Sequence, residues 1–258
     1  MNFSKKKQLK NKQDGLEAGT VTSFDFSQFR ERDWSNVLTC HQSKSNSGAS
    51  ESPSPQLWSY ANHSISKLAV QHKVGDQSRV TSVGVTLCGN FGVLGFQNGM
   101  ISKFNMQSGI DRGLFTVEKG VSSDSMTSGL HTGEVTGLGI DSLNKFLVSC
   151  SLDKTIKLWD FYRGKLLRTF FSEYPVDNLT YNRVNDLVAF SSSDLSLTLL
   201  NVKTGLKKVR HFEGAAQNKI TDICFSQPDS KWVLCSSMDK CIRVWDIITG
   251  QLIDWIQF

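Results

Sequence analysis

The sequence predicts an all-β chain built from repeated units of short strands. Two segments nearly superimpose: Phe146–Asp160 reads FLVSCSLDKTIKLWD, and Trp232–Asp246 reads WVLCSSMDKCIRVWD. Each begins with an apolar run, passes through a turn that contains Asp and Lys, and ends in Trp-Asp after a strand of alternating polarity. Helical periodicity of any length is absent from the chain.

Weaker copies extend the repeat. Leu187–Asn201 and Phe91–Asn105 follow the same order of elements, and a partial copy ends near Trp58. The repeat ends at positions 105, 160, 201 and 246 are 55, 41 and 45 residues apart. Periods of about 40–45 residues with Trp-Asp endings are typical of WD-repeat (WD40) β-propellers, in which each repeat forms one four-stranded blade. The sequence therefore predicts a β-propeller with four to five blades.

The predicted domain organisation is simple. We expect a basic, flexible N-terminal arm over residues 1–27, followed by propeller blades over residues 28–258. Two stretches rich in Ser, Thr, Gly and Pro, residues 43–55 and 118–129, indicate loop insertions. The second insertion explains the one long spacing between repeat ends.

The number of blades predicts an incomplete ring. A ring of seven blades needs about 280–315 residues, more than this chain has. An open fan of blades exposes unpaired strand edges, which natural proteins avoid. We therefore expect a fragment of a longer protein, or closure of the ring by another segment or subunit. A complete, small five-bladed ring is the alternative.

The positive charge is concentrated in the arm. The formal net charge is +5, and residues 1–12 contain five lysines and no acidic residue. Basic and acidic residues balance in the rest of the chain, which argues against a nucleic-acid footprint over the whole body. The arm could contact RNA phosphates, serve as a nuclear-localisation patch, or be a solvated loop. Its candidate RNA contacts are Lys5, Lys6, Lys7, Lys10 and Lys12.

The best-formed repeat also contains polar residues that could hold a blade together. In the WD family, groups at the positions of His131, Ser149 (or Ser151), Asp153 and Trp159 form a hydrogen-bonded network. A buried indole or imidazole without a partner costs roughly 1–3 kcal/mol, so such groups need one another. The second repeat keeps candidate members of this network: Ser236, Asp239 and Trp245. A hydrolase triad is the rival interpretation, but the repeat pattern already accounts for each residue.

Motifs for other chemistry are scarce. The sequence contains no P-loop, HExxH or GxSxG motif, and its six cysteines form no CxxC pair. No apolar run approaches the ~18 residues of a membrane-spanning helix. We therefore expect no enzyme activity, no catalytic residues, no cofactor, no metal, no small-molecule substrate and no membrane contact. A rigid surface for binding partners is the function that remains.

Several strings go beyond a generic blade and resemble one family. They are Arg30–Trp34 (RERDW), Leu38–Gln42 (LTCHQ), Thr86–Phe91 (TLCGNF), Asn105–Gly113 (NMQSGIDRG) and Leu252–Asp254. Their order and spacing resemble the WD-repeat subunit of the UTP-B subcomplex of the small-subunit processome, the family of U3 snoRNA-associated protein twenty-one. The similarity covers about residues 28–258, and it looks like most of the second propeller of that family.

The resemblance implies a nucleolar, non-catalytic scaffold in ribosome biogenesis. It implies that the protein supports U3 snoRNP assembly and the pre-rRNA processing that yields small-subunit rRNA. The implied partners are the other UTP-B subunits and processome proteins, with direct or indirect contact to the U3 snoRNP and pre-rRNA. A generic WD-repeat adaptor, such as a substrate adaptor of a ubiquitin ligase, is the alternative.

Overall fold

The computed structural model describes residues 20–42, 55–68, 70, 78–116 and 130–258. These residues form five four-stranded antiparallel sheets, which we call blades 1 to 5 in chain order. Blade 1 consists of β1 (Val21–Phe26), β2 (Val37–His41), β3 (Gln56–Ser59) and β4 (Ser64–Ile65). Blade 2 consists of β5 (Val80–Val85), β6 (Phe91–Phe96), β7 (Ile101–Asn105) and β8 (Asp111–Leu114).

The other three blades have longer outer strands. Blade 3 consists of β9 (Val135–Ile140), β10 (Phe146–Ser151), β11 (Thr155–Asp160) and β12 (Lys165–Phe171). Blade 4 consists of β13 (Val176–Asn182), β14 (Leu187–Ser192), β15 (Leu197–Asn201) and β16 (Lys207–Phe212). Blade 5 consists of β17 (Ile220–Phe225), β18 (Trp232–Ser237), β19 (Cys241–Asp246) and β20 (Leu252–Gln257).

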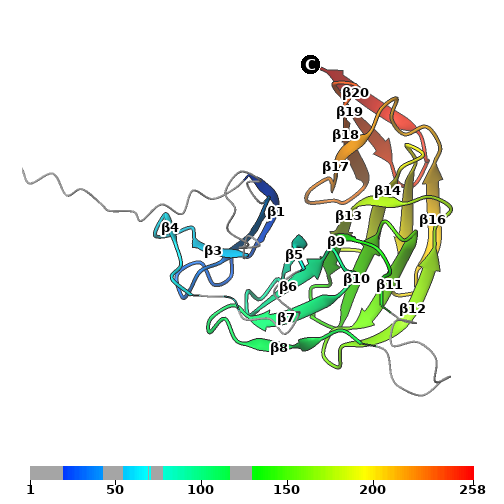
Figure 1. The fold of residues 1–258 in the computed structure, drawn as a ribbon. Coiled ribbons are helices and arrows are strands. Elements are labelled where there is room, and N and C mark those ends of the chain that lie inside the picture. The colour runs from blue at the N-terminus through cyan, green and yellow to red at the C-terminus, as the bar shows by residue number, and fades with distance from the viewer. Residues whose placement is uncertain (1–19, 43–54, 69, 71–77, 117–129) are drawn as a thin grey trace, which may run out of the picture.

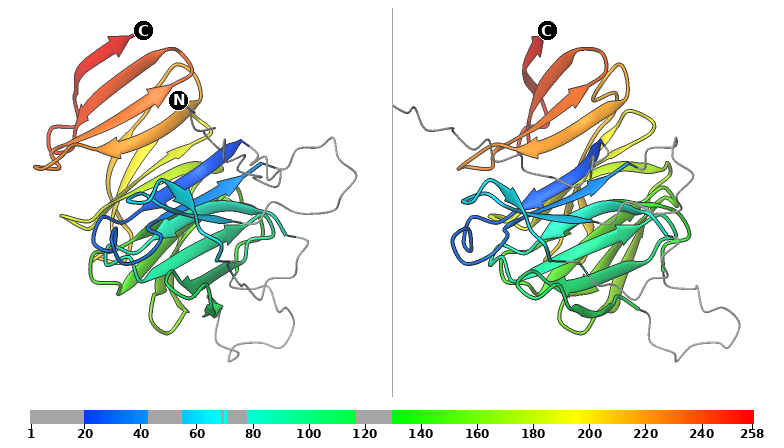
Figure 2. Two further views of the ribbon diagram at one scale, coloured as in Figure 1. Left: turned by 90° about the vertical axis from the view of Figure 1, so that its left-hand side faces the viewer. Right: turned by 60° about the vertical axis from the view of Figure 1, so that its left-hand side comes forward.

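The all-β propeller predicted from the sequence is confirmed, with five blades side by side along an arc (Figures 1 and 2). The first strand of each blade contacts the first strand of the next, in the order β1, β5, β9, β13, β17. These inner strands surround a cavity of about 740 Å³. No described residue covers the outer side of blade 5, where all of β20 is exposed.

Each junction between neighbouring blades has its own hydrophobic core. Four clusters fill the four junctions, and each draws side chains from two adjacent sheets. Because strand side chains alternate between faces, every middle blade has one apolar face for each neighbour. Stability therefore builds up from pairwise contacts between neighbouring blades.

Inner strands are also joined by a repeated polar contact. In these strands the second residue forms a β-bulge, and the side chain of that bulge residue reaches the next blade. The hydroxyl of Thr81 donates to the carbonyl of Val135 at 2.7 Å, and Thr136 donates to Val176 at 2.7 Å. In blade 4 Asp177 occupies the position of the threonine, and the next residue, Asn178, donates to the carbonyl of Ile220 at 3.1 Å.

The predicted boundary between arm and blades is wrong. Strand β1 lies at residues 21–26, inside the expected arm, and pairs with β2 along its length. Only three of its six residues are apolar, because an inner strand borders the central cavity on one side. That composition hid the strand in the sequence. Residues 1–19 and the predicted insertions, except Pro55, lie outside the described residues.

Candidate interaction surface

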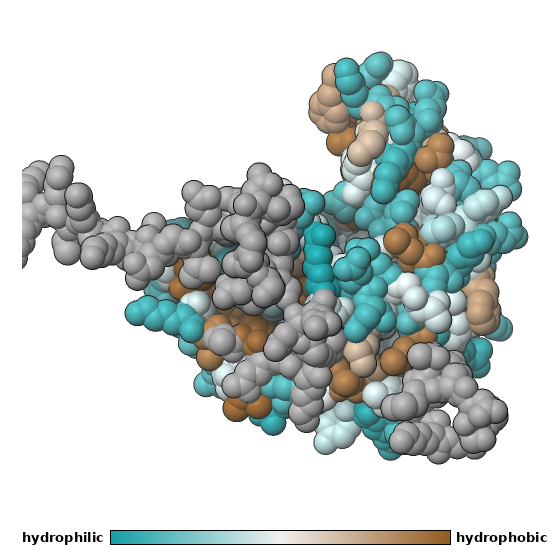
Figure 3. Space-filling model, viewed as in Figure 1, coloured by the Kyte–Doolittle hydropathy of each residue, from teal (hydrophilic) through white to brown (hydrophobic). Residues whose placement is uncertain are grey.

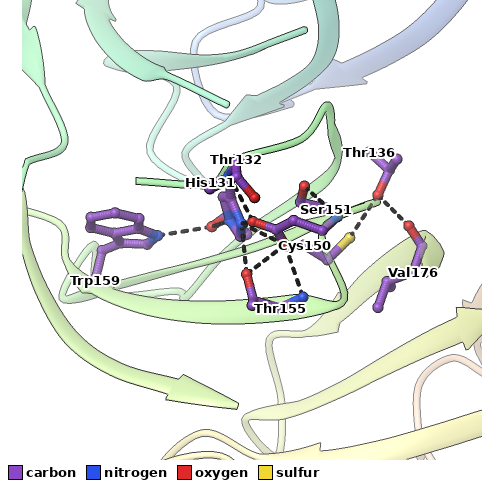
Figure 4. A network of polar contacts seen from close by, with 10 residues as sticks. His131, Thr132, Thr136, Cys150, Ser151, Thr155, Trp159 and Val176 are labelled. Atoms are coloured by element: carbon purple, nitrogen blue, oxygen red, sulfur yellow. Dashed lines mark hydrogen bonds and ion pairs between the residues drawn. The ribbon is translucent and has the colours of Figure 1, made fainter. Parts of the chain in front are cut away.

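The polar residues of blade 3 form a chain of hydrogen bonds within the blade (Figure 4). The indole N–H of Trp159 donates to Ser149 Oγ at 2.8 Å, and Ser149 Oγ lies 2.8 Å from His131 Nε2. On its other side, His131 Nδ1 lies 3.1 Å from Asp153 Oδ2. A neutral His131 with its proton on Nδ1 satisfies every partner, so we assign that tautomer from the network.

Asp153 anchors this network to the turn between β10 and β11. Its carboxylate accepts the backbone N–H groups of Thr132 and Thr155, both at 2.9 Å, and the Thr155 hydroxyl. Burial would raise the pKa of Asp153, but hydrogen bonds from His131 and Thr155 outweigh it and hold the pKa well below 3.8. Burial also lowers the pKa of His131 below 6.5, against the opposing influence of Asp153. His131 is therefore neutral at neutral pH.

The order Ser149, His131, Asp153 resembles a hydrolase triad, but its surroundings do not suit catalysis. The Ser149 side chain is completely buried, and its oxygen already accepts the indole N–H of Trp159. A nucleophile must reach its substrate. The geometry is therefore that of a structural hydrogen-bond network that links the strands of the blade.

In blade 5 the residues predicted as equivalents do not all meet. Ser236 bonds to Thr221 Oγ1 at 2.8 Å, on the face of the sheet away from Trp245. Including Ser236 in the network is therefore wrong, because Cys235 occupies the position of Ser149 and neighbouring strand residues point to opposite faces. Asp239 keeps its position in the turn, where it accepts the backbone N–H of Gln217 at 3.1 Å.

The sequence missed a partial network in blade 1. The indole N–H of Trp58 donates to Thr39 Oγ1 at 2.8 Å, and Thr39 Oγ1 lies 2.9 Å from His41 Nε2. Cys40 points to the opposite face, toward blade 2. The signal was present in principle: Thr39 lies two residues after the cross-strand partner of Trp58, as Ser149 does relative to Trp159.

Three of the sequence strings that a generic blade does not require meet at the junction of blades 1 and 2. The loop Ser27–Asn36, which contains RERDW, lies against the turn of TLCGNF, since Trp34 Nε1 donates to the carbonyl of Gly89 at 2.9 Å. Met106, from the third string, is buried in the core against which Trp34 packs. Its backbone N–H donates to the carbonyl of Asn90 at 2.9 Å.

Gly89 is required for this contact. Its φ is +71°, and a Cβ there would lie 3.1 Å from Arg30 Cγ and 3.2 Å from Ser27 Oγ. The Arg30 guanidinium in turn lies over the Trp34 ring and pairs with Asp33 at 3.0 Å. The three strings thus form one ordered surface, which we call the blade 1–2 surface.

A polar pocket opens on the blade 1–2 surface. Its volume is about 310 Å³, and its wall includes Glu31, Arg32, Asp33 and Gln107 beside the ring of Trp34. Arg32 and Asp33 are exposed, so their charges are available to a partner. Charged and hydroxyl groups of this kind suit specific docking of a partner better than storage of an apolar ligand.

Other kinds of site were sought among the described residues. They include no group of three or more His, Cys, Asp or Glu side chains that could hold a metal ion. Within the same residues, no helix is long and apolar enough to cross a membrane. The five arm lysines lie outside the described residues, and their proposed contact with RNA stays a prediction.

Five four-stranded blades, with the complete polar network in blade 3, define a WD-repeat β-propeller. Comparison with family models is more specific: residues 1–258 match the WDR36/Utp21 second β-propeller domain. The chain therefore belongs to the family of WDR36/Utp21 second β-propeller domains. The resemblance seen in the sequence is thereby confirmed.

Relatives come from fungi and humans. The chain is 35% identical over 256 residues to the U3 small nucleolar RNA-associated protein 21 homolog of Schizosaccharomyces pombe, covering 98% of this chain and 26% of that protein. It is 32% identical to human WD repeat-containing protein 36, and the match covers 91% of this chain and 24% of the human protein. For U3 small nucleolar RNA-associated protein 21 of Saccharomyces cerevisiae the identity is 31%, covering 96% and 25%. The chain thus spans about a quarter of the length of these relatives.

Among solved structures, the crystal structure of the computationally designed Ika8 protein is similar. Its TM-score is 0.64 at 24% identity, and the match covers 92% of this chain and 61% of that one. At this identity the likeness shows the fold alone.

Proposed function

We propose that this domain is a non-catalytic scaffold in ribosome biogenesis, in the nucleolus. In this proposal it is a component of the UTP-B subcomplex of the small-subunit processome and supports U3 snoRNP assembly and pre-rRNA processing. The observation that carries the proposal is its family membership over residues 1–258, with two relatives named for association with U3 small nucleolar RNA. Other UTP-B subunits are the proposed direct partners.

The blade 1–2 surface is the proposed docking site for those partners. It is built from three strings that a generic blade does not need, and these strings are ordered by Trp34 and Gly89. Its exposed charges stand on a loop held by hydrogen bonds to blade 2, so little entropy is lost when a partner binds.

The test is affinity purification of the full-length native protein from nucleoli, followed by detection of U3 snoRNA and of co-purifying proteins. A charge-reversed variant, Glu31→Arg/Arg32→Glu, should reduce recovery of its partner proteins by about 5- to 10-fold or more. The matched control, Asp229→Arg/Lys231→Glu, reverses an exposed pair on a turn of blade 5 and should leave recovery unchanged.

Two outcomes would contradict the proposal. Absence of the native protein from U3-containing particles would remove the assignment to the processome. Recovery dominated by subunits of a ubiquitin ligase would favour the adaptor alternative.

A further inference from the structure

Blade 4 keeps one member of the polar network of blade 3 and has lost the others. Asp194 follows β14 as Asp153 follows β10, and it accepts the backbone N–H of Ser196 at 3.2 Å as Asp153 accepts that of Thr155. The other positions carry different side chains: Ser172 precedes β13 where His131 precedes β9, Phe190 stands at the position of Ser149, and Leu200 stands at that of Trp159. No imidazole therefore hydrogen-bonds to Asp194 among the described residues.

A pocket of about 240 Å³ lies at these changed positions, between blades 3 and 4. Its wall includes residues at four positions of the network: Ser172, Phe190, Asp194 and Ser196. In blade 3 the corresponding place is filled by the imidazole of His131 (Figure 4). The pocket is thus open where blade 3 places a ring that carries an N–H group.

One buried hydroxyl in this pocket has no partner. Ser192 is 4% exposed and lines the pocket, yet its Oγ hydrogen-bonds to no described residue. The equivalent serines at the ends of β10 and β18 do have partners: Ser151 Oγ accepts the N–H of Asp153 at 3.1 Å, and Ser237 Oγ donates to the carbonyl of Asn218 at 2.8 Å. Buried polar groups of folded proteins are nearly all hydrogen-bonded, so this hydroxyl points to a polar ligand.

The charge of the pocket is predominantly negative. Its wall contains three carboxylates from three separate segments, and none of them forms an ion pair with a described residue. The three are Glu173, Asp194 and Glu213. Lys208 and His211 are the basic side chains of the wall, and Nδ1 of His211 lies 2.8 Å from Thr198 Oγ1. Three carboxylates beside one lysine favour a cationic ligand.

Aromatic rings also line the pocket. Phe170 and Phe190 lie edge to face with ring centroids 6.1 Å apart, and Tyr174 is 46% exposed. A guanidinium group stacks on aromatic rings, binds a carboxylate through two parallel N–H groups, and has further N–H groups for other acceptors. A lysine ammonium has the charge but lacks the plane. The pocket therefore suits an arginine side chain better than a lysine side chain.

We propose that this pocket binds an arginine side chain of a partner protein. The guanidinium pairs with Asp194, lies against the ring of Tyr174 and donates to Ser192 Oγ. The partner thereby supplies to Asp194 the N–H that His131 supplies to Asp153 within blade 3.

This pocket is separate from the blade 1–2 surface. It is formed by the turn between β14 and β15 and by the loops before β13 and after β16. The blade 1–2 surface is formed by the connections from β1 to β2 and from β5 to β6, at the opposite ends of the strands. Both surfaces can therefore be occupied at once, and the arginine pocket is independent of the docking site proposed above.

Titration of the ¹⁵N-labelled full chain with the peptide acetyl-Gly-Gly-Arg-Gly-Gly-amide, followed by NMR, tests this proposal. The backbone amide signals of Ser192 and Ser196 should shift as the peptide binds. The same peptide with citrulline in place of arginine keeps the shape but has no charge, and it should bind about 10-fold or more weakly.

Variants of the chain locate the binding. Asp194→Asn leaves an oxygen for Ser196 but removes the charge, and it should weaken binding of the arginine peptide by at least about 10-fold. Tyr174→Ala should weaken it about 2- to 5-fold, because a stacking surface for the guanidinium is lost. The control Asp254→Asn, at an exposed position of β20, should bind the peptide as the native chain does.

Four results would overturn the proposal. One is equal affinity for the arginine and citrulline peptides, and another is equal affinity for a lysine peptide, which identifies a site for any cation. The third is binding that both pocket variants leave unchanged although their spectra show them folded. The fourth is the absence of peptide-induced shifts up to about 10 mM peptide. Because purified chain and peptides are used, the outcome does not depend on co-purification with U3 snoRNA.

Discussion

At the scale of single residues, Ser149 is the centre of the blade 3 polar network. Its oxygen contacts Trp159 and His131 together, and all three side chains are buried. The sequence predicted the members of this network in blade 3 but misplaced one in blade 5. A shift of one position along a strand cannot be seen in composition, yet it moves a side chain to the other face.

Replacing Ser149 should therefore be costly. Ser149→Ala removes the shared partner of an indole N–H and an imidazole nitrogen, and we expect the free energy of unfolding to fall by about 2–4 kcal/mol. Urea denaturation followed by tryptophan fluorescence measures this change. Ser193→Ala, at an exposed turn position, is the matched control, and an equal effect of the two variants would contradict the role of the network.

The same network predicts how stability depends on pH. The pKa of His131 is lowered by burial, so the unfolded chain binds a proton first as the pH falls through about 6.5, and folding weakens there. The pKa of Asp153 is lowered as well, so a second loss begins as the pH falls through about 4.

Urea denaturation at pH 7 and pH 5 measures the loss of stability that is due to His131, because both values lie above the range in which Asp153 titrates in the unfolded chain. His131→Asn should be less stable than the native chain at pH 7 but should lose less stability on going to pH 5. The native chain should lose at most about 1.4 kcal/mol more free energy of unfolding per pH unit than His131→Asn does. Identical pH dependence in the two chains would show that His131 does not titrate in this range.

At the scale of elements, the inner strands are joined by side chains at their bulges or, in blade 4, one residue after the bulge. Thr81, Thr136 and Asn178 each donate to a backbone carbonyl of the next blade. In blade 5, Thr221 has no following blade among the described residues and bonds to Ser236 within its own sheet. The repeated Val-Thr pair was visible in the sequence, but its role depends on the distance between blades.

Thr136→Val tests this contact with little change in shape. The carbonyl of Val176 would lose its donor, and we expect the free energy of unfolding to fall by about 1 kcal/mol. Thr204→Val, at an exposed turn, provides the comparison by thermal or urea denaturation. No difference between the two variants would mean that the inter-blade hydrogen bond adds nothing to stability.

At the scale of the whole molecule, blade 5 packs against only one neighbouring blade among the described residues. Residues of blade 3 that are buried against blade 4 include Val148, Ile156 and Leu158. Their equivalents in blade 5, Leu234, Ile242 and Val244, are only partly buried. Hydrophobic side chains (brown) accordingly lie open on the blade at the top of Figure 3. A partly exposed apolar face of this kind is suited to packing against another sheet.

Matched truncations at equivalent positions measure this difference. Ile156→Ala should reduce the free energy of unfolding by about 2–5 kcal/mol, because it leaves a cavity between two blades. Ile242→Ala should reduce it by only about 1 kcal/mol in this chain, because the side chain is still partly in water. In a chain extended to the length of the relatives, a covered face would make the two costs similar, and denaturation of both forms measures the difference.

The sequence by itself determined the class of the fold, because alternating strands, turn residues and a repeat are local patterns that survive without knowledge of distances. It also determined the family, since strings such as NMQSGIDRG exceed what a blade needs. Only the tertiary structure decided that β1 belongs to blade 1, that Trp34 and Gly89 join two of those strings, and that three carboxylates and Ser192 line one pocket between blades 3 and 4. Each of these three features depends on which distant segments become neighbours in space. Packing between sheets determines those neighbours, and the order of residues along the chain does not show them.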